Sequence, residues 1–262
     1  TAVGAAALGA NTTGTLNVAV GALALDANTT ADKNTAIGYD TLSANTTGTQ
    51  NTALGTYGLK ACQTGNDNTG LGYIALYNAN GSQNTAVGSR ALQDMTTGDD
   101  NVAVGYHALH TNTTASDNTA VGSNALFANT TGLQNTAIGV NALDANTTAN
   151  NNTAVGYDAL TANTTGTQNV AVGGNALAAN TTADYNIAIG QNCLAVNTTG
   201  TQNTAVGAYA LDANTSGNYN VAIGLNALTN NSNASSNTAL GYETLKANTT
   251  GTENTAVGHN AL

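Results

Sequence analysis

The sequence predicts an all-β fold, a parallel β-solenoid or β-roll of about fifteen coils with seventeen residues each. The first observation is a repeat with the consensus Asn-Thr-Ala-Val-Gly-x-x-Ala-Leu-x-Ala-Asn-Thr-Thr-Gly-x-x, seen for example from Asn152 to Gln168. The second is that β-branched or apolar residues at positions two and four alternate with a small residue at position three, as in a strand. The third is that Gly, Thr and Asn, which are poor helix formers, fill much of the rest. A short fixed period indicates one unit stacked on itself.

Positions one to five should form the strand of each unit. Positions two and four should share one face, and we expect the position-four residue to join the Leu of position nine in the core. A second short strand is expected around the Ala-Leu pair. The expected core residues, taken from three representative units, are Val20, Leu25, Ile37, Leu42, Val155 and Leu160.

The residue at position three is always small, with Ala19 and Ala36 as examples and Gly70 as the one exception. A column of small residues indicates that another backbone comes close. That backbone is either the opposite wall of the same coil or a sister chain, and we favour the sister chain. The protein would then be a homotrimer.

Two invariant residues should make the corners of each coil. Gly at position five suits a backbone with positive φ, and Asn at position one tolerates the left-handed region and can hydrogen-bond along the stack. The Asn-Thr-Thr-Gly segment should be the tolerant loop, because the unit from Asn68 to Gln83 is one residue short in that half. The corner residues expected in the same three units are Asn17, Gly21, Asn34, Gly38, Asn152 and Gly156.

The composition of the chain makes some classes of binding partner unfavourable. Four Lys and Arg residues stand against fourteen Asp and Glu residues, and a net charge of −10 disfavours nucleic acid and anionic membranes. No apolar run is long enough to span a bilayer. We expect residues 1–262 to be a single continuous repeat array, an excerpt of a longer fibre without capping units. We also expect self-association, either as a homotrimer or as an end-to-end fibre.

The sequence offers little that could be catalytic. His107 and His110 have an H-x-x-H spacing, but no third metal ligand lies near them in sequence. Carboxylates do not recur in adjacent units, and no nucleophile-base pattern or phosphate-binding loop repeats. We expect no enzyme activity, no cofactor and no metal.

The Asn-Thr-Thr segments have two interpretations. They match the N-glycosylation sequon, and they are also good turn formers that could make a side-chain ladder, which we favour. Sugars on Asn or on Thr would coat the loop face of the fibre. The candidate glycosylation sites are Asn28, Asn45, Asn112, Asn129, Asn146, Asn163, Asn180, Asn197 and Asn248.

Two further surface functions are conceivable. Tyr after the invariant Gly could stack on the sugar rings of a glycan, or could simply pack on neighbouring coils, which we favour. Stacked Thr columns could bind ice, although the paired Thr residues should point in different directions. The candidate glycan-stacking residues are Tyr39, Tyr73, Tyr106, Tyr157 and Tyr242.

The repeat resembles those of phage tail-fibre-domain proteins and of bacterial surface proteins identified as adhesins. It is similar, more distantly, to the head repeats of trimeric autotransporter adhesins of the Yersinia adhesin type, whose S-V-A-I-G core appears here as Asn186 to Gly190. The head repeat of those adhesins is shorter and lacks the Asn-Thr-Thr-Gly loop. The resemblance covers the whole chain and implies a rigid, homotrimeric β-roll stalk or binding head. It implies an extracellular location, on a cell or virion surface, with structural and adhesive roles.

Overall fold

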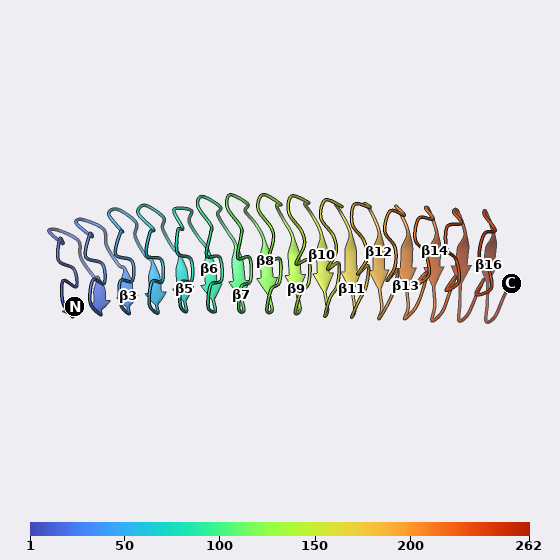
Figure 1. Cartoon of the computed structure of the whole chain (residues 1–262), viewed down its shortest axis with the longest axis horizontal. Coiled ribbons are helices and arrows are strands. Elements are labelled where there is room, and N and C mark those ends of the chain that lie inside the picture. The colour runs from blue at the N-terminus through green and yellow to red at the C-terminus, as the bar shows by residue number, and fades with distance from the viewer. The chain divides into compact units, whose positions relative to one another are not determined.

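The computed structural model describes residues 1–262 as an all-β protein with sixteen short parallel strands and no helix. The chain forms two compact units, Thr1–Leu133 and Gln134–Leu262, and each is a stack of similar coils. Every coil contributes one strand and then a long turn-rich segment that returns the chain to the next strand (Figure 1). This is the β-solenoid that the repeat predicts.

Each strand covers positions two to four of its repeat and pairs with the same positions of the next coil. Ala19 lies opposite Ala36, and Thr69 lies opposite Thr85 even though one residue is missing between them. The strands of the first unit are β1 (Ala2–Val3), β2 (Val18–Val20), β3 (Thr35–Ile37), β4 (Thr52–Leu54), β5 (Thr69–Leu71), β6 (Thr85–Val87), β7 (Val102–Val104) and β8 (Thr119–Val121). Those of the second are β9 (Thr136–Ile138), β10 (Thr153–Val155), β11 (Val170–Val172), β12 (Ile187–Ile189), β13 (Thr204–Val206), β14 (Val221–Ile223), β15 (Thr238–Leu240) and β16 (Thr255–Val257).

The core lies between the inner face of the strands and the Leu column of position nine. Leu25, Leu42 and Leu160 are fully buried, as expected, and so are nearly all the Ala residues of positions three and eight. The expectation that position four belongs to the core is wrong. Ile37 is 38% exposed, and Val20 and Val155 are partly exposed. The space inside a coil is too narrow for two bulky columns, so Ala faces inward and the β-branched residues face outward.

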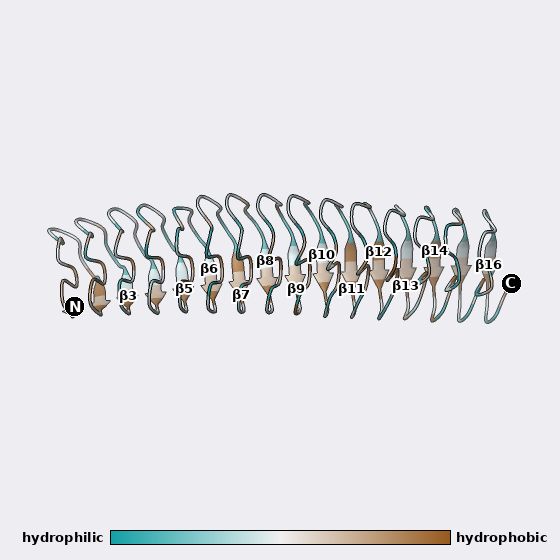
Figure 2. Ribbon diagram, viewed as in Figure 1, coloured by the Kyte–Doolittle hydropathy of each residue, from teal (hydrophilic) through white to brown (hydrophobic).

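The small column at position three therefore faces the opposite wall of its own coil, and the sister-chain interpretation of that column is wrong. A Cβ added to Gly70 would lie 3.2 Å from Leu59 Cδ1 and 3.3 Å from the carbonyl oxygen of Ala75. The outer face of the strands instead carries Thr, Val, Ile and Leu. Figure 2 shows this as brown colour along β7 and β11, where positions two and four are both Val.

The corner at position five is as expected. Gly21, Gly38 and Gly156 have φ near +139°, a conformation closed to residues with a Cβ, and a Cβ on Gly21 would overlap the carbonyl of Gly38. The other corner differs, because the left-handed residue is the one before Asn, such as Lys33 with φ 60°. The Ala-Leu segment is a turn rather than a second strand, and its Leu is also left-handed, with φ 52° at Leu25.

Asn at position one joins neighbouring coils, as the sequence suggested. Nδ2 of Asn17 donates to the carbonyl of Ala31 at 2.7 Å, and Oδ1 of Asn17 accepts from the backbone N–H of Asn34 at 2.8 Å. The same two bonds recur at Asn34 with Gly48 and Asn51. Because these side chains are buried and fully paired, the Asn column ties each coil to the next one.

Candidate binding surface

Positions seven and ten of each coil point outward beside the Leu column, because the residues between them, at positions eight and nine, point into the core. In most coils these two positions hold small or short polar residues such as Asn175 and Ala178. In the coils that follow β4 to β8 they hold large ones instead. These are Tyr57, Lys60, Ile74, Tyr77, Arg90, Gln93, His107, His110 and, at position ten of the last of these coils, Phe127.

Part of this surface is hollowed. Five half-buried side chains from three successive coils line a pocket of about 360 Å³, which we call the Tyr77 pocket. That volume lies within the usual range for small-molecule sites, about 300–1,000 Å³. Its lining residues are Tyr57, Lys60, Ile74, Tyr77 and Gln93.

The cation of the pocket is held in place. Nζ of Lys60 lies 2.8 Å from Oδ2 of Asp40 and 4.8 Å from the centre of the Tyr57 ring. The hydrogen bond to Asp40 raises the pKa of Lys60, so the ammonium stays charged while Asp40 balances it. The Tyr57 ring in turn contacts Tyr39 edge-on at 5.6 Å and Tyr73 at 6.3 Å. The pocket therefore presents a fixed aromatic surface beside a neutralised ion pair.

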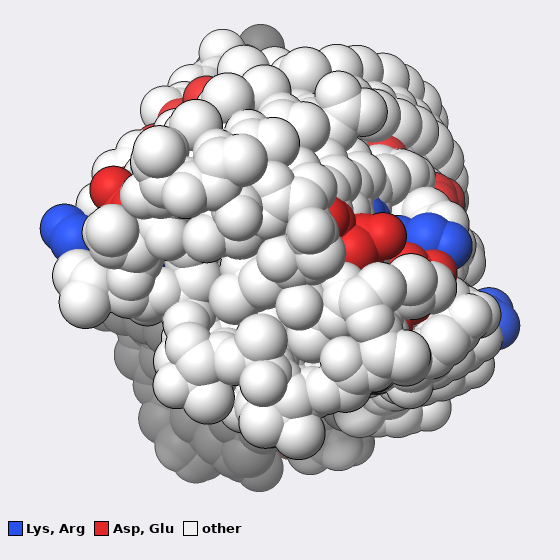
Figure 3. All heavy atoms as spheres, turned by 90° about the vertical axis from the view of Figure 1, so that its left-hand side faces the viewer, with Lys and Arg blue, Asp and Glu red and all other residues white.

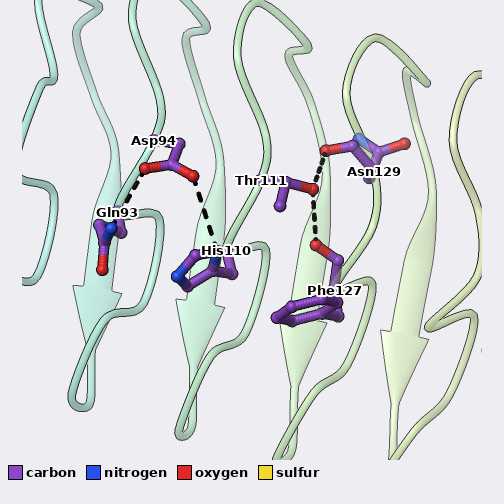
Figure 4. A network of polar contacts seen from close by, with 6 residues as sticks. All are labelled: Gln93, Asp94, His110, Thr111, Phe127 and Asn129. Atoms are coloured by element: carbon purple, nitrogen blue, oxygen red, sulfur yellow. Dashed lines mark hydrogen bonds and ion pairs between the residues drawn. The ribbon is translucent and has the colours of Figure 1, made fainter.

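Gln93 supplies the other polar group. Its Nε2 donates to Oδ1 of Asp94 at 3.2 Å, and its Oε1 points away from Asp94 (Figure 4). This orientation follows from Asp94, whose carboxylate can only accept hydrogen bonds. Oε1 of Gln93 is buried without a hydrogen-bond partner. A buried acceptor without a donor is energetically unfavourable.

A cluster of rings continues the surface beyond the pocket. His107 stacks on Tyr106 at 3.8 Å and touches His110 at 4.7 Å, and His110 stacks on Phe127 at 5.3 Å. Burial lowers the pKa of both His residues, and the neighbouring Arg90 acts in the same direction. The chain has no group of three or more His, Cys, Asp or Glu residues placed to hold a metal ion.

The Asn residues of the Asn-Thr-Thr segments do not lie on the surface. Nδ2 of Asn28 donates to Oδ1 of Asn11 at 2.9 Å and to the carbonyl of Ala31 at 3.1 Å. An N-linked sugar would attach at this nitrogen, so the folded coil offers no access there, and the turn-and-ladder interpretation describes the geometry. Eight of the candidate sites are fully buried, namely Asn28, Asn45, Asn112, Asn129, Asn146, Asn163, Asn180 and Asn197. Asn248 is half-buried, and its Nδ2 makes the same two kinds of bond.

The five Tyr residues considered for glycan stacking are all exposed, and the structure groups them differently. Tyr39 and Tyr73 flank Tyr57, whereas Tyr106 stacks on His107. Tyr157 lies beside Asp158, whose hydrogen bond raises the pKa of the Tyr157 hydroxyl, and Tyr242 stacks on His259 at 5.0 Å. The residues expected from the sequence were Tyr at position six, and they did not include Tyr57, Lys60, Tyr77 or Gln93. The signal was present as large residues at positions seven and ten of consecutive units.

Two cysteines remain, and both are buried free thiols. Burial raises the pKa of Cys62 to about 11 and that of Cys193 to about 12. Both groups are therefore protonated and poorly reactive at neutral pH.

Charged side chains are sparse. Seen end-on from the N-terminal side, most of the surface carries neither acidic nor basic groups, and some basic atoms lie directly beside acidic ones (Figure 3). The chain contains no helix long and apolar enough to cross a membrane. No protein-family model matches the sequence, and no curated protein is similar to it.

Proposed function

We propose that this protein is a structural segment of an extracellular fibre, located on a cell or virion surface, that extends and displays a surface rather than catalysing a reaction. The observation that carries the proposal is the repeated set of contacts between successive coils within each unit. Backbone ladders, the Asn17-type bonds and the Leu column repeat in every coil, and each extends the stack by one more unit. Such an arrangement gives length and stiffness.

We further propose that copies of this chain pack against one another through the outer face of the strands, as a homotrimer. Positions two and four form two adjacent columns on that face. They leave Ile187, Ile189, Ile223 and Leu240 between 38% and 44% exposed. Monomeric soluble proteins rarely leave an extended apolar surface open, so a second copy is the partner that fits a face repeated along the array.

Light scattering coupled to size-exclusion chromatography tests this proposal on the chain as it stands. The expected mass is three times the 25.8 kDa of one chain. Resistance to a broad-specificity protease should accompany it, because the folded coils have few accessible backbone segments. A mass of 25.8 kDa at all concentrations would overturn the homotrimer, and rapid digestion of the whole chain would overturn the stiff fibre.

Ice binding is the second candidate, and the outer face also carries the observation that favours it. Thr35, Thr52, Thr69 and Thr85 follow one another at position two of β3 to β6, on a sheet with regular strand spacing. Val102 then interrupts the column. Because the same face cannot be covered by a sister chain and by ice, a monomer with thermal hysteresis would favour this function. A trimer without hysteresis would exclude it.

A further inference from the structure

We propose that the Tyr77 pocket is a binding site for a neutral sugar ring, which places a glycan-binding function in one short part of an otherwise structural array. This proposal does not depend on self-association. The pocket is built from positions seven and ten, whereas the outer strand face is built from positions two and four. Three features of the pocket support this proposal: its departure from the repeat, its polar atoms and its aromatic walls.

The pocket lies where the repeat is least regular. Features that only serve stacking recur in every coil. The three coils of the pocket instead depart from the consensus of the repeat at one column, position twelve. Position twelve, elsewhere Asn, is Cys62 in the first coil, Ala79 in the second and Met95 in the third. Ile74 is also the one β-branched residue among the left-handed positions, with φ 59°. A β-branched side chain is strained in that conformation, and such strain concentrates at functional sites.

The polar groups of the pocket specify a ligand that both donates and accepts hydrogen bonds. Oε1 of Gln93 needs a donor, and the hydroxyl of a sugar supplies one. Nζ of Lys60 has three hydrogens, of which Asp40 takes one, so the ammonium can donate to a ligand oxygen. Because Asp40 already balances this charge, an anionic ligand gains little, and a neutral one is favoured.

The walls specify a ligand with an apolar face. The rings of Tyr57 and Tyr77 and the side chain of Ile74 offer flat apolar surface close to these polar atoms. A sugar ring has the matching construction, with C–H groups on one face and hydroxyls around its edge. An aromatic side chain of a peptide would fill the same space but would leave Oε1 of Gln93 without a donor. The pocket therefore fits a sugar better than a peptide.

The experiment uses the full chain and a panel of four neutral probes and one charged probe. The neutral probes are methyl β-glucopyranoside, methyl β-galactopyranoside, methyl α-mannopyranoside and N-acetylglucosamine, and the charged one is methyl glucuronide. Saturation-transfer difference NMR should detect at least one neutral probe, and titration calorimetry should give its affinity. Binding of no neutral probe, or of the glucuronide alone, would overturn the proposal.

Two variants locate the site with residues that the same column carries elsewhere. Tyr77→Ala introduces the residue found at Ala178, and Gln93→Ser the residue found at Ser43, so the coil is known to tolerate both. Each should weaken binding at least about tenfold. The matched control is Tyr209→Asn, which removes an exposed Tyr at position seven outside the pocket and should leave the affinity unchanged. Wild-type affinity in both pocket variants would overturn the proposal, as would equal loss in the control.

Light scattering on the same samples separates this proposal from the proposed fibre. A trimer that binds no sugar would overturn only the sugar-binding proposal. A monomer that binds sugar would overturn only the homotrimer. Circular dichroism of each variant checks that the β-solenoid is intact.

Discussion

The buried Oδ1 of Asn45 accepts no hydrogen bond, because Cys62 occupies the place of the Asn that would donate to it from the next coil. One coil earlier the ladder is intact, and Nδ2 of Asn45 donates to Oδ1 of Asn28 at 3.1 Å. The Asn column is therefore a series of separate links. A single replacement breaks the links of that one residue and leaves the Oδ1 of the preceding coil buried and unsatisfied, which should cost about 1–3 kcal/mol.

Asn197→Cys should reproduce this defect in the second unit. Nδ2 of Asn197 donates to Oδ1 of Asn180 at 3.2 Å and to the carbonyl of Gly200 at 2.9 Å. Oδ1 of Asn197 accepts from Nδ2 of Asn214 at 2.9 Å. The variant removes all three bonds. We expect the free energy of unfolding to fall by about 1–3 kcal/mol, measured by denaturant titration. Thr199→Ala is the control, because it also removes the sequon but changes an exposed residue. If the two variants lost equal stability, the ladder would not be the cause.

The corner glycine gives a second prediction with a matched control. Gly156 has φ +139°, and an added Cβ would meet the carbonyl oxygen of Gly173 at 2.5 Å. Gly156→Ala should therefore destabilise the protein by more than about 1 kcal/mol. Gly174→Ala should stabilise it by about 0.4–1 kcal/mol, because its Cβ would meet nothing closer than the carbonyl oxygen of Tyr157 at 4.0 Å and would restrict the unfolded chain. Thermal unfolding of both variants tests this, and equal effects would contradict it.

The period of the repeat was sufficient to predict the solenoid, because the Gly, Asn and Leu columns leave few ways to stack. It was not sufficient to predict which face of the strand points inward. Val20 is larger and more apolar than Ala19, and hydrophobicity alone places Val20 inside. The width of the coil decides otherwise, since Leu25 already fills the space opposite. That width depends on the left-handed conformation of Leu25, for which Leu has no special preference.

The candidate site was less predictable for a related reason. Tyr57 and Lys60 lie three residues apart, but Asp40, Tyr77 and Gln93 come from other coils. Only the stacking register brings them together. The unpaired Oε1 of Gln93 depends on a rotamer and a neighbour, so no sequence pattern reveals it.

Lowering the pH should weaken the first unit through its two neighbouring His residues. Burial lowers the pKa of His107 and His110, so the folded chain binds fewer protons than the unfolded chain below their ordinary pKa of about 6.5. The stability from these groups is therefore present at neutral pH and is lost as the pH falls. Asp94 acts to raise the pKa of His110, against the effect of burial. Arg90 acts to lower the pKa of both His residues.

The matched variant for the pH prediction is the double change His107→Asn and His110→Thr, which uses residues found at Asn141 and Thr161 in the same columns. Thermal unfolding of both proteins should be compared between pH 7 and pH 5.5, where most carboxylates stay ionised. We expect the wild-type melting temperature to fall more than that of the variant. Parallel curves would show that the His pair does not control stability in this range.

Charged residues introduced on the outer strand face should prevent association between copies without preventing folding. Ile189 and Ile223 are about 40% exposed on that face, so replacing both with Lys changes no core contact. The double variant should remain a β-solenoid by circular dichroism but should have the mass of a single chain, because like charges would face one another between copies. Leu211→Ala is the opposite case, since it empties a fully buried position and should cost about 2–5 kcal/mol without altering the outer face. A lysine variant that kept the wild-type oligomer would place the contact between copies on another face.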